Sequence, residues 1–291
     1  MNPVSKRSVI AIIIALLIVS GLALAGSQGG KTVNGFPIFA ICVAVAIGIQ
    51  WVAFLPAFAM QTETFYDLTG SLSFLTAITV AIVLSKANDI RSLLLAGMIA
   101  LWALRLGTFL FTRVRAAGED RRFREIKPNF ARFMLTWTLQ GLWVSFSTAT
   151  ALVVMTSTTP VGMDIFMVVG FVVWLFGFVL EVTADRQKRA FNANPANKGK
   201  FIRSGLWAWS RHPNYFGEIV LWIGVTIIAL PVLRGWQWVT LISPLFITLL
   251  LTRLSGVPLL EKRADDEWGG QAEYEAYKAK TPVLIPRAPK P

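Results

Sequence analysis

Eight long apolar segments restrict what this sequence can fold into. A helix needs about 20 apolar residues to cross the ~30 Å hydrocarbon core of a bilayer. Segments of that kind lie at about residues 8–26, 36–60, 69–86, 91–113, 132–155, 161–183, 215–233 and 236–254. Hydrophobic residues make up 55% of the 291 residues and charged residues only 15%, so one water-soluble core could not bury all the apolar surface. The sequence therefore predicts an all-α, polytopic integral membrane bundle of about eight transmembrane helices.

The basic residues between these segments indicate the orientation of the chain. The formal net charge of +12 would suggest a nucleic-acid partner in a water-soluble protein, but here the basic residues gather in a few connections, as they do in cytoplasmic loops. Those of the fourth connection are Arg113, Arg115, Arg121, Arg122, Arg124, Lys127 and Arg132, and those of the sixth are Arg186, Lys188, Arg189, Lys198, Lys200, Arg203 and Arg211. We therefore expect both connections and both termini on the cytoplasmic side of the membrane, and no nucleic-acid partner.

The first apolar segment has two interpretations. Lys6 and Arg7, the apolar run and the small residues of GLALAGS also describe a secretory signal peptide. We favour a retained helix, so that residues 1–30 form an N-terminal transmembrane helix or uncleaved signal anchor, and residues 36–291 form one membrane domain with a cytoplasmic C-terminal tail. Cleavage would leave seven spans with the same cytoplasmic loops.

The chain has one cysteine and one histidine, which limits the metal chemistry that it can support. A disulfide framework, a cysteine-based zinc or iron–sulfur site and a multi-histidine site are all excluded. Cys42 lies inside an apolar run and is expected to be a packing residue. No metal site is predicted.

Charged groups at membrane depth are costly and need a partner or a function, and the first cluster of them follows the second apolar segment. It contains Gln61, Glu63, Tyr66 and Asp67 within seven residues at the membrane boundary. Such groups could polarise or protonate a lipid-like molecule that enters from the bilayer. The alternative is a helix cap followed by an interfacial tyrosine.

A second polar cluster occupies one face of the predicted helix that ends the sixth segment. Its members follow one another at intervals of three or four residues, and they are Glu181, Asp185, Arg189 and Asn192. Lys198, Lys200 and Arg203 follow in a Gly- and Asn-rich stretch, so the two groups together could hold phosphates. The alternative is a solvated face with ion pairs between successive turns.

The third cluster is the segment Gly205–Glu218, which contains the single histidine, His212. Pro213 suits the first turn of a helix, whose N-terminus is a natural binding place for an anion. Asn214 and Glu218 then lie one turn apart on one face. A lone histidine is more often structural, but the concentration of polar residues here favours a functional site.

The segment Arg211-His212-Pro213-Asn214-Tyr215-Phe216-Gly217-Glu218 resembles the steroid 5-alpha-reductase C-terminal superfamily, and the layout of the chain resembles the bacterial DUF1295 branch of it. The other segments that fit this branch are Thr62–Gly70, Leu101–Gly107, Gly118–Phe123 and Ser255–Lys262. The likeness covers about residues 36–286. It implies a seven-helix reductase core that holds NADPH between cytoplasmic loops and the later helices, and a lipid-like enone that enters from the membrane.

The resemblance also implies a cofactor site, carried over residue by residue. Asp185 and its neighbours match acidic and amide contacts, Arg105 matches a phosphate-binding arginine, and Tyr277 matches a C-terminal tyrosine on the adenosine side. The implied cofactor contacts are Arg105, Glu181, Asp185, Arg189, Asn192, Lys200, Arg203, Trp209, Arg211, His212, Asn214, Tyr215, Glu218 and Tyr277.

On the substrate side, Gln61 and Glu63 fall near the Gln-Glu pair that contacts the substrate ketone in steroid reductases. Here Thr62 separates them, and Trp102 stands where the family has a ketone-contacting tyrosine, so Tyr66 is the substitute. The implied reaction is hydride transfer from NADPH to the β-carbon of an α,β-unsaturated ketone. Glu63, Gln61 and Tyr66 would be the catalytic residues, with Glu63 protonated because burial favours the neutral carboxyl group.

Two other classes of protein remain as alternatives. Isoprenylcysteine and phospholipid methyltransferases share a similar Arg-His-Pro segment and use S-adenosylmethionine, which carries no phosphate, so the many basic residues around 186–211 favour the reductase. A non-catalytic lipid-binding or transport protein would be expected to show inverted repeats or broken helices near the membrane midplane. Neither pattern is visible in the sequence.

Overall fold

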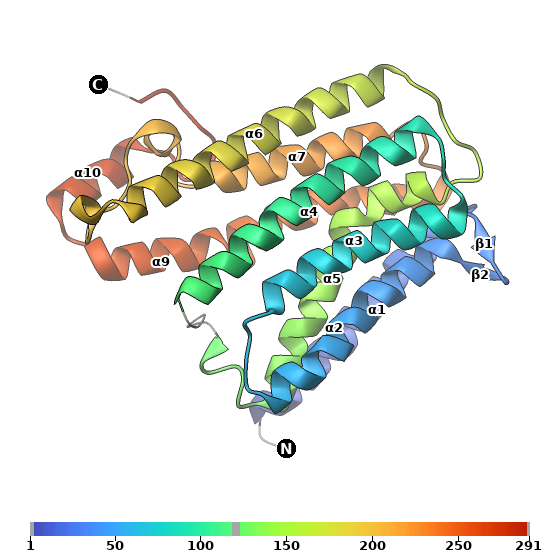
Figure 1. Ribbon diagram of the computed structural model, residues 1–291, viewed down its shortest axis with the longest axis horizontal. Helices are drawn as coiled ribbons and strands as arrows, with labels where there is room; N and C mark the ends of the chain where they lie inside the picture. Colours follow the sequence, from blue (N-terminus) through green and yellow to red (C-terminus); the bar gives the residue numbers. More distant parts are fainter. Residues whose placement is uncertain (1–2, 118–122, 290–291) are drawn as a thin grey trace. The chain divides into compact units, whose positions relative to one another are not determined.

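The computed structural model describes residues 3–117 and 123–289, and Figure 1 shows it as a ribbon. Seven helices in these ranges are long and apolar enough to span a membrane, so the predicted polytopic helical membrane protein is confirmed. The chain forms two compact units. The first comprises Met1–Met167 and Ile228–Ser243, and the second comprises Val168–Ile227 and Pro244–Pro291.

The first unit is a helical bundle with one short hairpin of strands (Figure 1). Its elements are α1 (Pro3–Gly26), β1 (Thr32–Val33), β2 (Phe36–Pro37), α2 (Ile38–Ala59), α3 (Tyr66–Ser85), α4 (Ile90–Ala117), α5 (Phe130–Met155) and η4 (Gly235–Leu241). Helix α5 packs against α1, α2 and α3. Residues 140–157 are buried except for Trp143, so α5 is the centre of this unit.

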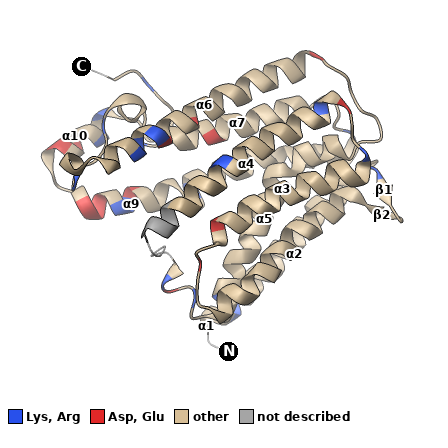
Figure 2. Cartoon of the chain, in the orientation of Figure 1, with Lys and Arg blue, Asp and Glu red and all other residues tan. Residues whose placement is uncertain are grey.

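The second unit contains the later helices and the C-terminal tail (Figure 1). Its elements are α6 (Ile165–Ala193, whose first residues belong to the other unit), η2 (Pro195–Asn197), η3 (Gly205–Ala208), α7 (Pro213–Ala229), α8 (Ile242–Leu249), the π-helical turn η5 (Leu250–Leu254), α9 (Val257–Trp268) and α10 (Ala272–Lys280). In Figure 2 the charged residues of α6 lie in its C-terminal half, and α9 and α10 also carry charged residues.

The observed helices follow the predicted apolar segments closely, with two differences. The expected seventh span, 215–233, is α7, which has only 17 residues. The expected eighth span, 236–254, is part of a longer helical stretch, Gly235–Trp268, that runs through η4, α8, η5 and α9. The first apolar segment forms α1, and whether residues 1–30 are a separate segment stays a prediction.

Polar side chains set the starts of several helices. The Asn129 side chain accepts a hydrogen bond from the backbone N–H of Arg132 at the start of α5, at 3.0 Å. Asp164 caps α6 in the same way, since its carboxylate accepts from the N–H of Met167 at 2.9 Å. Pro213 is the first residue of α7, as predicted.

Arg91, near the start of α4, is fully buried in the first unit. Its guanidinium donates to the carbonyl oxygens of Val161 at 3.2 Å, of Gly162 at 2.7 Å and of Ile228, and it forms a 2.7 Å ion pair with Asp164. A buried charge is tolerated only when it is fully paired in this way. Arg91 therefore holds the start of α4 to the α5–α6 connection and to the end of α7.

Helices α6 and α7 approach one another through glycines in the second unit. A Cβ atom on Gly177 would lie 2.5 Å from the backbone nitrogen of Leu221, and one on Gly217 would lie 2.7 Å from that of Glu181. Small residues of this kind allow helix backbones to pack closely in membranes. The contact places the start of α7 beside the polar end of α6.

Candidate active site

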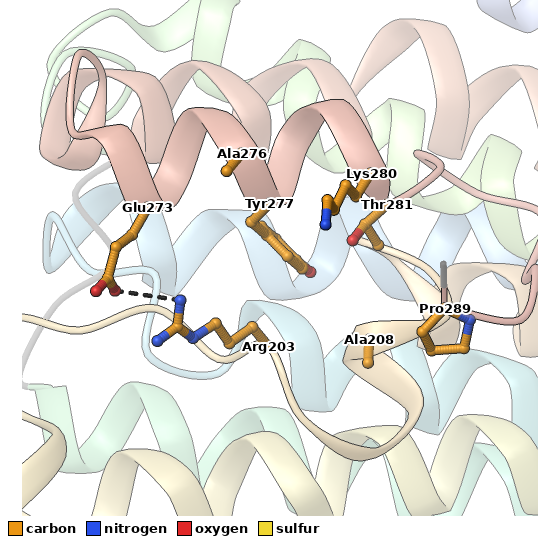
Figure 3. A pocket seen from close by; sticks show the side chains of 8 residues that line it. All are labelled: Arg203, Ala208, Glu273, Ala276, Tyr277, Lys280, Thr281 and Pro289. Carbon is orange, nitrogen blue, oxygen red and sulfur yellow. Dashed lines mark ion pairs between the residues drawn. The ribbon is translucent and has the colours of Figure 1, made fainter. Parts of the chain in front are cut away.

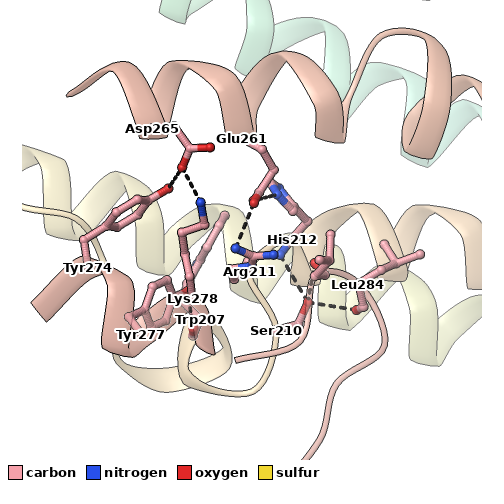
Figure 4. Close-up of polar contacts among 11 residues, drawn as sticks. Trp207, Ser210, Arg211, His212, Glu261, Asp265, Tyr274, Tyr277, Lys278 and Leu284 are labelled. Atoms are coloured by element: carbon pink, nitrogen blue, oxygen red, sulfur yellow. Dashed lines mark hydrogen bonds and ion pairs between the residues drawn. The ribbon is translucent and has the colours of Figure 1, made fainter. Parts of the chain in front are cut away.

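One carboxylate binds the two basic residues at the start of the predicted motif. Glu261, on α9, is hydrogen-bonded to His212 Nε2 at 2.6 Å and forms an ion pair with Arg211 Nη1 at 2.8 Å, as Figure 4 shows. The side chain of His212 is buried, and that of Arg211 is nearly so. Glu261 therefore fixes the orientation of both side chains.

His212 is held in a form that can accept a hydrogen bond from a ligand. Burial lowers its pKa below the ordinary value, although the hydrogen bond with Glu261 opposes this shift. A neutral imidazole has one N–H, and donation from Nε2 to Glu261 leaves Nδ1 as an acceptor. Among the described residues Nδ1 has no hydrogen-bond partner.

The C-terminal tail is bonded to the loop that carries this motif. The N–H of Arg211 donates to the carbonyl oxygen of Pro282 at 2.9 Å, and the N–H of Arg287 donates to that of Trp209 at 3.0 Å. Between them, the Ser210 hydroxyl donates to the Leu284 carbonyl at 2.8 Å and accepts from the His212 N–H at 3.1 Å (Figure 4). The tail thus holds the backbone on both sides of Ser210.

Helix α7 presents the next motif residues to α6. The Asn214 amide donates to Asp185 at 3.2 Å, which joins the second and third predicted clusters. The ring of Tyr215 stacks on that of His212, with 5.8 Å between the ring centroids. These contacts place Asp185, His212, Asn214 and Tyr215 in one connected group.

A cavity of about 200 Å³ lies beside this group, and we call it the His212 cavity. Five of the predicted cofactor contacts line it: Asn192, Lys200, Arg211, His212 and Tyr277. Its other charged or polar lining residues are Lys188, Trp207, Glu261, Arg263, Glu267, Trp268 and Tyr274. Basic side chains therefore outnumber the carboxylates, which suits an anionic ligand.

Trp207 supports one wall of the His212 cavity. Its indole N–H donates to the Ala184 carbonyl at 3.0 Å, and the Lys188 ammonium lies 4.5 Å from the centre of its ring. The Tyr277 hydroxyl donates to the Trp207 carbonyl at 2.7 Å, and burial raises the pKa of Tyr277, so this phenol stays protonated. The wall is built from residues that are already paired, which keeps it rigid.

The remaining predicted cofactor contacts lie elsewhere. Arg203 lines a second cavity, while Arg189 and Trp209 line neither of these two cavities. Glu181 and Glu218 are buried on α6 and α7. These placements leave their predicted cofactor roles as predictions.

Arg105 belongs to the first unit, on α4. Its guanidinium carbon lies 5.8 Å from the centre of the Phe109 ring. Its predicted role as a phosphate contact stays a prediction. The Gly118–Arg122 part of a segment quoted for the family resemblance, and the side chains of residues 113–117, lie outside the described residues.

The predicted substrate cluster lies in the first unit, in the connection between α2 and α3. Glu63 is buried and forms an ion pair with Lys127, with 2.5 Å between Oε2 and Nζ. The Lys127 ammonium is thus a hydrogen-bond donor beside Glu63, and the predicted catalytic role of Glu63 stays a prediction. Lys127 was counted in the sequence only as part of a basic loop.

The other two members of the substrate cluster have different surroundings. Tyr66 is the first residue of α3, and its hydroxyl donates to the Thr136 carbonyl at 3.0 Å. Gln61 is exposed and adopts a positive φ of 50°, while its amide donates to the Phe58 carbonyl at 2.7 Å. A positive φ is uncommon for a residue other than glycine and marks the sharp turn after α2. Only Glu63 of the three is deeply buried.

Trp102, which stands where the family has a tyrosine, is a core residue of the first unit. It is 1% exposed and packs edge-to-face on Phe74 at 5.1 Å between ring centroids. Cys42 is also fully buried, as expected for a packing residue.

Two important residues could not be identified as site residues from the sequence. Glu261 was visible only as the acidic residue of the Ser255–Lys262 segment, 49 residues from His212. Ser210 was visible only as an ordinary residue before the motif. In each case the sequence shows only that the residue lies in or beside a segment quoted for the family resemblance. That position does not show which residue it contacts.

The residues present fit a dinucleotide at the His212 cavity. Buried polar atoms are normally hydrogen-bonded, yet Nδ1 of His212 and Nε of Arg211 find no hydrogen-bond partner among the described residues. Together they offer one acceptor and one donor at a wall that also carries Lys188 and Lys200. This combination suits a molecule with both amide and phosphate groups.

Comparison with known proteins identifies the family of the chain. The family model described as "Protein of unknown function (DUF1295)" matches residues 53–281. The chain belongs to the DUF1295 family. The resemblance noted from the motif is thereby confirmed at the level of the family. No solved structure matches the chain.

Curated relatives of this DUF1295 protein carry the names of two kinds of enzyme. The 3-oxo-5-alpha-steroid 4-dehydrogenase 1 of Rattus norvegicus is 29% identical over 118 residues, which is 40% of each chain, and that of Mus musculus matches to the same extent. The probable O-methyltransferase ustE of Ustilaginoidea virens is 38% identical over 50 residues, 17% of this chain and 18% of the relative. The DUF1295 protein thus spans less than half the length of either relative. The match to the two steroid dehydrogenases covers the longer stretch.

Proposed function

We propose that this protein is a membrane-embedded, NADPH-dependent reductase of the C=C bond in a lipid-like α,β-unsaturated ketone, with a steroid- or isoprenoid-like skeleton. The observation that carries the proposal is the group formed by Arg211, His212 and Glu261 at the wall of a basic cavity. The similarity to the rat steroid dehydrogenase supports the same chemistry. We also propose that the site faces the cytoplasm of a bacterial cell and that the substrate enters from the bilayer.

The second unit would hold the cofactor. Lys188, Lys200 and Arg211 would neutralise phosphates, and His212 would accept a hydrogen bond through Nδ1. When bound, NADPH would supply the hydride. The protein's contribution is to hold His212 neutral through burial, to fix its ring through Glu261 and to keep the wall of the cavity rigid.

The Glu63 and Lys127 pair would act on the substrate. The Lys127 ammonium has three protons and directs one of them to Glu63, so it can also donate to a carbonyl oxygen. An ammonium beside this oxygen stabilises the negative charge that develops on it during reduction. Tyr66 and Gln61 would shape the surroundings of the oxygen, since the hydrogen-bond donor of each already has a carbonyl partner.

The second candidate is an S-adenosylmethionine-dependent membrane methyltransferase, which the short match to ustE favours. S-adenosylmethionine carries no phosphate, so the excess of basic side chains around the His212 cavity favours NADPH over it. The two candidates therefore make opposite predictions about which cofactor binds.

Ligand-dependent melting of the purified full chain separates the two candidates. A ligand present at about one hundred times its Kd stabilises the folded state by about 2.7 kcal/mol. We expect NADPH to raise the melting temperature and S-adenosylmethionine to leave it unchanged. Stabilisation by S-adenosylmethionine alone would replace the reductase with the methyltransferase, and failure of both would remove both proposals.

A further inference from the structure

A second cavity, of about 370 Å³, lies in the same unit between η3, α10 and the C-terminal tail (Figure 3). We call it the Arg203 cavity. Its lining residues are Arg203, Ala208, Glu273, Ala276, Tyr277, Lys280, Thr281 and Pro289. Tyr277 also lines the His212 cavity, so one side chain is shared by the two spaces.

An ion pair joins two of the lining residues of the Arg203 cavity. Arg203 Nη1 lies 3.1 Å from Glu273 Oε2, and the two side chains are 56% and 72% exposed (Figure 3). Exposed ion pairs of this kind contribute little to stability, so another anion can replace the carboxylate at small cost. The planar guanidinium matches a phosphate group especially well.

Phe201 helps to place the Arg203 guanidinium. Its ring lies 5.8 Å from the Arg203 guanidinium carbon and packs against the Tyr277 ring, with 5.4 Å between ring centroids. Arg203 is thus held next to the side chain that the two cavities share. Glu273 marks the place that an anionic group would take on the guanidinium.

The sizes of the cavities favour one ligand that extends through both. Small-molecule sites usually measure about 300–1,000 Å³, and the His212 cavity of about 200 Å³ is smaller than that. A dinucleotide whose reactive end lies by His212 must therefore extend further. The Arg203 cavity is the adjoining space, and its two cations, Arg203 and Lys280, outnumber its one carboxylate.

We propose that the Arg203 cavity binds the ribose phosphate that distinguishes NADPH from NADH, and that Glu273 pairs with Arg203 until this phosphate replaces it. The inference rests on the proposed function and adds the origin of cofactor selectivity. Arg203 selects the phosphate, Lys280 adds positive charge, and Glu273 keeps the guanidinium in position in the free protein.

Dinucleotide affinities of the purified full chain in phosphatidylcholine nanodiscs test this proposal. Arg203→Ala should weaken NADPH binding about 10-fold or more, as expected for the loss of a hydrogen bond to a charged group, and should leave NADH binding unchanged. Glu273→Gln should tighten NADPH binding and leave NADH binding unchanged. Lys262→Ala removes one exposed positive charge that lines neither cavity, and should change neither affinity.

Fragments and lipids complete the test. Adenosine 2′,5′-bisphosphate should displace NADPH better than adenosine 5′-monophosphate, and this advantage should vanish in Arg203→Ala. Equal weakening of NADPH and NADH by Arg203→Ala, or no effect on either, would overturn the inference while leaving the proposed function intact. Loss of NADPH selectivity on adding phosphatidic acid would assign the cavity to a lipid headgroup instead. If Arg203→Ala fails to fold, Glu273→Gln decides the outcome, and absence of all dinucleotide binding removes the proposed function as well.

Discussion

Lys127 Nζ lies 2.5 Å from Glu63 Oε2, and this ion pair is almost fully enclosed in the first unit, with 16% of the lysine side chain and 3% of the glutamate side chain exposed. The pair joins the α2–α3 connection to the segment before α5. Because a carboxylate only accepts hydrogen bonds, the ammonium is the donor within this pair.

Replacing Lys127 should therefore impair turnover more than cofactor binding. Lys127→Met should lower kcat for enone reduction about 100-fold, the typical loss when one donor to a developing oxyanion is removed. NADPH affinity should stay the same, because the lysine belongs to the first unit and the proposed cofactor residues of the His212 cavity belong to the second. Lys86→Met, at an exposed position, is the matched control. Equal kcat in the two variants would remove Lys127 from the mechanism.

His212 should make the free energy of unfolding depend on pH below about 6.5. Burial lowers its pKa below the unperturbed value of 6.5, so the unfolded chain binds a proton at a pH where the folded chain does not. Stability is then unaffected above about pH 6.5 and falls as the pH decreases through this value towards the folded-state pKa. Melting temperatures between pH 7 and 5 should fall more steeply for the wild type than for His212→Asn. A steeper fall in the variant would contradict the assignment of a neutral histidine.

Glu261 should stabilise the second unit through its two partners. Glu261→Ala leaves Arg211 and His212 without this partner, and we expect a loss of about 1.5–3 kcal/mol in the free energy of unfolding. Asp266 is exposed on the same helix, five positions after Glu261. Asp266→Ala is therefore the control and should cost less than about 0.5 kcal/mol. Chemical denaturation in detergent measures both, and similar values for the two variants would show that the contact carries no stability.

The glycine contact between α6 and α7 should tolerate no additional atoms. Gly217→Ala would place a Cβ atom 2.7 Å from the carbonyl oxygen of Gly177, and overpacking of this kind costs about 1–3 kcal/mol. The Asn214–Asp185 hydrogen bond should weaken with it, because the same two helices carry both residues. Gly48→Ala, where no atom lies within 4 Å, is the control and should be neutral or slightly stabilising. Thermal melting of both variants provides the comparison.

Arg91 should be needed for the first unit to remain folded. Arg91→Met removes the donor to three carbonyl oxygens and the partner of Asp164, and we expect a loss of about 3–5 kcal/mol. Asp164→Asn keeps the three carbonyl contacts and should cost less. A melting temperature of Arg91→Met within a degree or two of the wild type would show that these Arg91 contacts are not needed for stability.

Features that depend on neighbouring residues could be predicted from the sequence. The apolar segments predicted the helices because the thickness of the bilayer's hydrocarbon core fixes how many apolar residues a spanning helix needs. Pro213 predicted the start of α7, since proline fits the first turn and little else in a helix. The motif that begins at Arg211 and the polar face of α6 were both singled out as polar clusters, and the Asn214–Asp185 hydrogen bond joins them.

Features that depend on distant partners could not be predicted. Glu63 and Lys127 are 64 residues apart, and His212 and Glu261 are 49 residues apart. Each pairing is set by how the helices pack, and no periodicity within one segment contains that information. The Lys127 partner of Glu63 was missed for this reason, because the sequence argument considered only the burial of Glu63.

The bonds between the C-terminal tail and the motif loop have a consequence for how the protein is made. Ser210 donates to the carbonyl oxygen of a residue 74 positions later, and the backbone of Arg211 bonds to Pro282. During synthesis the loop therefore leaves the ribosome before the tail residues that it bonds to have been made. Until then the N–H of Arg211 lacks its carbonyl partner in the tail. The proposed cofactor site is therefore completed only after the tail has been made, so a nascent chain that stalls within α10 already contains His212 but still lacks the tail residues that hold its loop.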